Sequence, residues 1–93
     1  MPTGSVQLDF GAFPGKTDAT AVVTGQSAIT ASSFVEAWIA PDVTTEHSAD
    51  EHWVDPPAVV AGNIVAGTGF TIYGVTRDHR RTWGKWNVDW VWT

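Results

Sequence analysis

Four side chains that can bind metal ions or transfer protons crowd into one short stretch of the sequence: His47, Asp50, Glu51 and His52. Imidazole and carboxylate groups are ligands of zinc and other transition metals. The histidine spacing fits neither a helical zinc site nor a zinc finger, and a single loop cannot surround an ion with four ligands. The nearest further imidazole, His79, belongs to a distant charged segment. We therefore expect no metal, and His47 and His52 stay candidates only if symmetry-related copies pool their side chains.

Residue types used in catalysis are present, but they form no recognisable catalytic pattern. The sequence contains no cysteine, so no thiol can act as a nucleophile, and no serine lies in a nucleophile-elbow motif. Scattered carboxylates such as Asp9 and Asp89 could in principle act as the acid and base of a glycosidase. A chain of 93 residues rarely builds the required cleft as well. We predict a protein that is not an enzyme and that holds no cofactor.

Three of the six tryptophans lie at alternate positions near the end of the sequence. Trp86, Trp90 and Trp92 share one face of a predicted strand with Val88. A strand this apolar would promote aggregation if it formed a free sheet edge. We therefore expect it to be central in its sheet or covered by another chain, with the three indoles in the core or at a subunit interface.

Other aromatic and charged residues are candidates for contact with a ligand or a partner. Trp53 lies in the acidic segment and Trp83 beside a basic cluster, while Tyr73 lies on the wetter side of its strand. Exposed rings of this kind can stack on sugars. The acidic and basic side chains could pair within one chain or between copies. The full candidate set is Trp53, Trp83, Tyr73, Asp50, Glu51, Arg77, Arg80 and Arg81.

Alternating apolar and polar residues predict the elements that position these side chains. Strands are expected at 6–10, 20–24, 33–39, 58–61, 63–66, 69–74 and 85–93. A helix is the alternative for 33–39, but Pro41 would stop it early. Residues 41–57 are polar and acidic, and we expect them to form the longest loop and to face outward. About six to eight short strands indicate an all-β fold, a compact antiparallel β-sandwich or small barrel, formed as a single domain by residues 1–93.

Composition excludes several classes of partner. With 43% hydrophobic and 16% charged residues, the chain is too apolar to be disordered. Its net charge of -5 repels nucleic acid phosphates and anionic membranes, so we expect neither as a partner. The sequence also lacks the long apolar run of a membrane span and the basic, apolar start of a signal peptide. These features predict a protein made in the cytoplasm.

A series of short motifs along nearly the whole chain resembles small virion-associated proteins of tailed bacteriophages. In order, the motifs are Phe10-Gly-Ala-Phe-Pro-Gly15, Asp18-Ala19, Val23-Thr-Gly-Gln26, Ala37-Trp38, His47-Ser-x-Asp-Glu-His52, Ala61-Gly-Asn-Ile64, Ala66-Gly-Thr-Gly-Phe-Thr-Ile-Tyr-Gly74 and Gly84-x-Trp-Asn-Val88, followed by Trp90 and Trp92. The resemblance implies a β-sandwich assembled in several copies and located in the virion.

On this resemblance we expect a tail or fibre-associated structural subunit that contacts copies of itself, with a trimer as the first guess, and other virion proteins. A capsid decoration protein is the nearest alternative. The alternative from another class is a module that binds a host surface glycan or receptor through exposed tryptophans.

Overall fold

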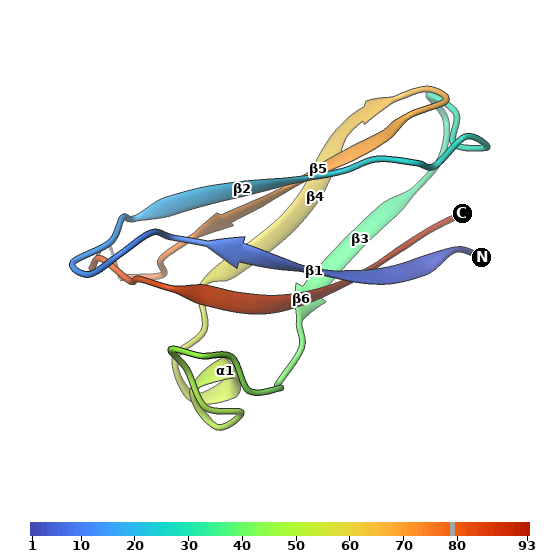
Figure 1. Cartoon of the computed structure of the whole chain (residues 1–93). Helices are drawn as coiled ribbons and strands as arrows, with labels where there is room; N and C mark the ends of the chain where they lie inside the picture. Colours follow the sequence, from blue (N-terminus) through green and yellow to red (C-terminus); the bar gives the residue numbers. More distant parts are fainter. Residues whose placement is uncertain (79) are drawn as a thin grey trace.

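The computed structural model describes residues 1–78 and 80–93, which form two three-stranded antiparallel sheets and one short helix (Figure 1). The strand order is β1-β6-β3 in one sheet and β2-β5-β4 in the other. The elements are β1 (Thr3–Asp9), β2 (Asp18–Val23), β3 (Val35–Ile39), α1 (Glu51–Val54), β4 (Ala58–Val65), β5 (Gly69–Val75) and β6 (Lys85–Trp92). The predicted all-β antiparallel sandwich is confirmed.

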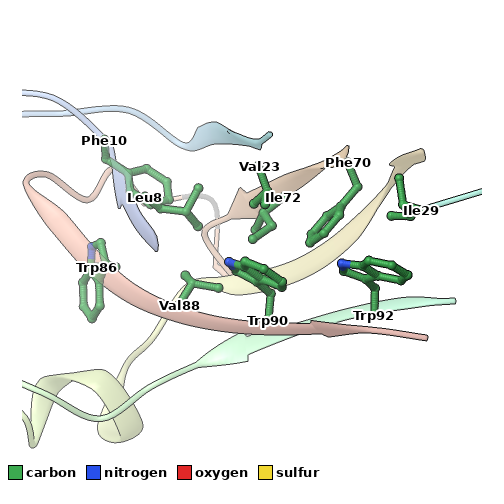
Figure 2. Close-up of a cluster of buried hydrophobic side chains, with 10 residues drawn as sticks. All are labelled: Leu8, Phe10, Val23, Ile29, Phe70, Ile72, Trp86, Val88, Trp90 and Trp92. Carbon is green, nitrogen blue, oxygen red and sulfur yellow. The ribbon is translucent and has the colours of Figure 1, made fainter. Parts of the chain in front are cut away.

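The core lies between the facing surfaces of the two sheets, because inward residues alternate with outward ones along each strand. Figure 2 shows it as one continuous cluster that runs the length of the sandwich. Its members are Leu8, Phe10, Val23, Ile29, Phe70, Ile72, Trp86, Val88, Trp90 and Trp92. The two sheets approach so closely at Gly74 of β5 that a Cβ there would lie 2.6 Å from Leu8 Cδ1.

The tryptophan-rich strand β6 is central in its sheet, between β1 and β3, as the sequence predicts for so apolar a strand. Trp86, Trp90 and Trp92 are all buried within this one chain. The ring of Trp90 meets Phe70 of the opposite sheet edge-to-face, with centroids 5.4 Å apart. Trp92 Nε1 donates to the side-chain oxygen of Gln26 at 2.8 Å. The three indoles therefore lie in the core, which is the first of the two positions that the sequence predicts for them.

Strand β4 is one continuous element, whereas the sequence suggests two short strands around Gly62. Its register with β5 shifts between Gly62 and Val65, and Asn63 has a positive φ of 51°. A β-bulge inserts an extra residue while the strand continues on both sides. The glycine thus marks a bulge and not a turn.

The long connection between β3 and β4 differs most from its prediction. It contains α1, which lies outside the two sheets on the β6 side (Figure 1). Most of its residues are exposed, so the segment faces outward as expected, but His47, His52, Pro56 and Pro57 are buried and anchor it to the sandwich. Within the described residues, no helix is long and apolar enough to cross a membrane.

Candidate functional site

A pocket of about 450 Å³ opens between the α1 segment and the connection from β5 to β6. We call it the end pocket, because that connection lies at the end of the sandwich away from the two termini (Figure 1). Its lining draws on residues 47–57 and 76–86. Six of the eight predicted contact residues meet here: Trp83, Asp50, Glu51, Arg77, Arg80 and Arg81.

The other two predicted contact residues lie elsewhere. Trp53 projects from α1 with 70% of its surface exposed, and Tyr73 lies on the outer face of β5. Trp83 packs edge-on against Phe13, with centroids 5.0 Å apart and planes at 78°. In the described part of the chain no two exposed rings are stacked side by side, so the predicted sugar-stacking platform of Trp53, Trp83 and Tyr73 does not form.

His47 contacts both segments that line the pocket, one through each of its ring nitrogens. Nδ1 lies 2.8 Å from Glu51 Oε2, and Nε2 lies 2.6 Å from the carbonyl oxygen of Trp83. A carboxylate and a carbonyl are both acceptors, so each nitrogen must carry a hydrogen to donate. Both contacts are hydrogen bonds together only when both ring nitrogens carry hydrogen, and the ring lies between a carboxylate and a carbonyl with 4% of its surface exposed.

The same imidazole ring lies flat against a tryptophan of β6. The ring centroids of His47 and Trp86 are 3.9 Å apart, and the ring planes are 24° from parallel. Stacked aromatic rings attract each other beyond the burial of their surfaces. This stack binds the β3–β4 connection to the central strand of its sheet.

His52 has a structural role at a position where the sheet is incomplete. Its Nδ1 donates to the carbonyl of Ser48 at 2.8 Å, and its Nε2 accepts the backbone N–H of Asn87 at 3.1 Å. The last β3–β6 pair is Ile39 with Val88; beyond it Ala40 N–H still donates to the carbonyl of Asn87 at 3.0 Å, but the Asn87 N–H is left to His52. The neutral imidazole replaces the missing strand as acceptor.

The two histidines are therefore occupied by hydrogen bonds rather than free to ligate an ion. Among residues 1–78 and 80–93, no three histidine, aspartate or glutamate side chains are grouped to hold a metal. His79, the third imidazole considered from the sequence, lies outside the described residues. The expectation of a solvated loop is wrong for His47 and His52, because both side chains are buried. Their hydrogen bonds compensate for this burial.

The charged groups pair differently from the prediction. The hydrogen bond from His47, followed by one from the Ser48 backbone, holds the pKa of Glu51 below its usual value. The pKa of Asp78 is likewise lowered by its hydrogen bond with Arg80. The expected pairing of Asp50 or Glu51 with the basic cluster is thus replaced within the chain by Glu51–His47 and Arg80–Asp78.

Two buried polar atoms of pocket-lining residues have no hydrogen-bond partner in the part of the chain that the structure describes. They are Nε1 of Trp86 and Oγ1 of Thr76. Sequence reasoning assigned Trp86 to a core or interface and overlooked Thr76. The one sequence feature that could have indicated Thr76 as a pocket residue is its position directly after β5 and before the basic cluster.

Comparisons with known proteins identify no relative, since no family model, curated protein or solved structure matches the chain.

Proposed function

We propose that the protein is a non-enzymatic structural subunit that assembles with copies of itself through the outer face of sheet β2-β5-β4. The observation that carries the proposal is the apolar character of this face. Its exposed large side chains include Val22, Val60, Tyr73 and Val75. Contiguous exposed apolar surface of this kind is typical of protein interaction sites.

The pairing register shows how these side chains are grouped. Thr20, Tyr73 and Val60 lie directly opposite one another across the three strands. The next rows are Val22, Thr71 and Gly62 on one side, and Asp18, Val75 and Ala58 on the other. Asp18, in an end row, is the one charged residue of the three rows. Two copies can therefore meet over the middle of this face without burying like charges.

The opposite outer face of the sandwich is more polar, although Trp38 lies on it opposite Asp89 and is 45% exposed. There Ser5 lies opposite Asp89, and Gln7 lies opposite Asn87, with which it forms a side-chain hydrogen bond of 3.2 Å. This difference favours one face for association and leaves the other for solvent. A copy of the chain is the partner we propose, because the flat neutral centre of the apolar face matches itself.

The resemblance to small virion-associated proteins supports a particle component as the setting. We propose a tail or fibre-associated subunit first and a capsid decoration protein second. Burial of Trp86, Trp90 and Trp92 and the lack of a stacked pair of exposed rings among the described residues favour assembly over glycan stacking. Mass spectrometry of purified phage particles tests this setting. A fixed stoichiometric amount of the chain supports it, and absence from washed particles contradicts it.

Light scattering over a range of concentrations tests the assembly itself. We expect the wild-type protein to have the mass of two or three chains, and Val60→Lys to have the mass of one. Phe34→Lys is the matched control, because Phe34 is exposed at least as much as Val60 (79% against 63%) but precedes β3 of the other sheet. A wild-type monomer at all concentrations, or equal dissociation by both substitutions, would contradict the proposal.

A further inference from the structure

We propose that the end pocket binds a neutral, hydroxyl-rich small molecule such as a single hexose unit. The site is separate from the apolar assembly face, so the two proposals stand independently. Its volume of about 450 Å³ falls in the range typical of small-molecule sites, roughly 300 to 1,000 Å³. The wall combines aromatic surface from Trp83 and Trp86 with charged side chains from both flanking segments.

The charges around the pocket nearly cancel, and this balance selects the class of ligand. Three guanidinium groups lie in the lining, at Arg77, Arg80 and Arg81. Four carboxylates also line it, at Asp50, Glu51, Asp55 and Asp78, of which Glu51 pairs with His47 and Asp78 with Arg80. A phosphate or another strong anion would meet four like charges, while a cation would meet the arginines. A neutral ligand with vicinal hydroxyls can instead accept from guanidinium groups and donate to carboxylates.

The two unpartnered atoms give the second, independent indication. Trp86 Nε1 can only donate, and Thr76 Oγ1 can donate or accept. A buried polar group without a partner destabilises the fold unless a bound molecule satisfies it. Both residues line the pocket, and both are more than nine-tenths buried.

The indole N–H signals in a ¹H–¹⁵N NMR spectrum provide the test. The protein is titrated with the methyl glycosides of glucose, galactose and N-acetylglucosamine to about 100 mM, which covers weak millimolar affinities. We expect a saturable shift of the Trp86 indole signal with at least one glycoside. The Trp92 indole signal is the internal control, because its N–H already donates to Gln26.

Matched variants and a competing ligand complete the test. Thr76→Val keeps the side-chain shape and removes the hydroxyl, so it should weaken binding about 2- to 12-fold. Thr3→Val, far from the pocket on β1, should leave the affinity unchanged. The proposal is overturned by an unmoved Trp86 signal with all three glycosides. A saturable response to inorganic phosphate alone, or unchanged affinity in Thr76→Val, overturns it equally.

Discussion

The imidazole of His47 lies flat against the indole of Trp86, with ring centroids 3.9 Å apart. The same imidazole donates to Glu51 and to the carbonyl of Trp83. One side chain thus joins the β3–β4 connection, the end of the β5–β6 connection and the central strand β6. Since these segments surround the end pocket, the shape of the pocket depends on this contact.

Replacement of His47 tests that dependence. His47→Ala leaves the carbonyl of Trp83 and the carboxylate of Glu51 without their shared donor, and it opens a gap against Trp86. We expect a loss of about 2 to 4 kcal/mol in the free energy of unfolding, measured with urea. Thr45→Ala is the control in the same connection, because Thr45 is exposed, and it should change stability by less than about 0.5 kcal/mol. Equal stability of both variants would show that the stack contributes nothing.

Acid should weaken the fold in part through Glu51. Its pKa is lowered in the folded state below the ordinary value of 4.5 by its hydrogen bond with His47. A carboxyl with a lowered folded pKa adds stability that is complete above its unfolded pKa and is lost as pH falls through the folded one.

The stability of Glu51→Gln should therefore lie below that of the wild type at neutral pH and converge with it under acid. Asp78 also has a lowered pKa, so Asp78→Asn is measured alongside to separate the two carboxyls. We compare the free energies of unfolding of wild type and Glu51→Gln. If their difference stays constant from neutral to strongly acid pH, ionised Glu51 does not stabilise the fold and the prediction is contradicted.

Gly74 is required by the close approach of the two sheets. A Cβ at this position would lie 2.6 Å from Leu8 Cδ1 and 3.4 Å from Phe10 Cζ. We expect Gly74→Ala to destabilise the protein by about 1 to 3 kcal/mol in thermal or chemical unfolding. Gly62→Ala is the matched control in β4, because no atom would lie within 4 Å of its Cβ. The reverse ranking of the two variants would show that the sheets are spaced differently.

Trp90 should contribute more to stability than any exposed tryptophan. Its side chain is 7% exposed and packs against Phe70, so Trp90→Ala should cost about 3 to 5 kcal/mol. Trp53, on α1, is 70% exposed, and Trp53→Ala should change stability by less than about 0.5 kcal/mol. A folded Trp90→Ala variant with an unchanged melting temperature would mean that β6 is placed incorrectly.

The strands could be predicted because their periodicity is local. The alternation of Trp86, Val88, Trp90 and Trp92 indicates both the strand and its buried face without knowledge of any partner. The bulge in β4 could not be predicted, because it depends on how that strand pairs with β5. Gly62, which interrupts the apolar run of β4, is compatible with either a turn or a bulge.

The candidate site was predicted in its composition but not in its contacts. The sequence left open whether the acidic and basic segments meet within one chain or between copies, and within the chain they line one pocket. Polar residue types in a segment without periodicity indicate solvent exposure, so the burial of His47 and His52 was missed. That burial depends on acceptors and donors at Trp83 and Asn87, which lie more than thirty positions away in the sequence.

Cysteine cross-linking tests the central claim, that copies of the chain associate through the outer face of sheet β2-β5-β4, most directly. The chain has no cysteine, so a single introduced thiol is the only target for a bismaleimide reagent. Val60→Cys places it on the apolar face, and Ser5→Cys places it on the polar face of the other sheet. We predict rapid formation of covalent dimers by Val60→Cys and little by Ser5→Cys. Equal cross-linking of the two variants, or preferential cross-linking of Ser5→Cys, would contradict the account.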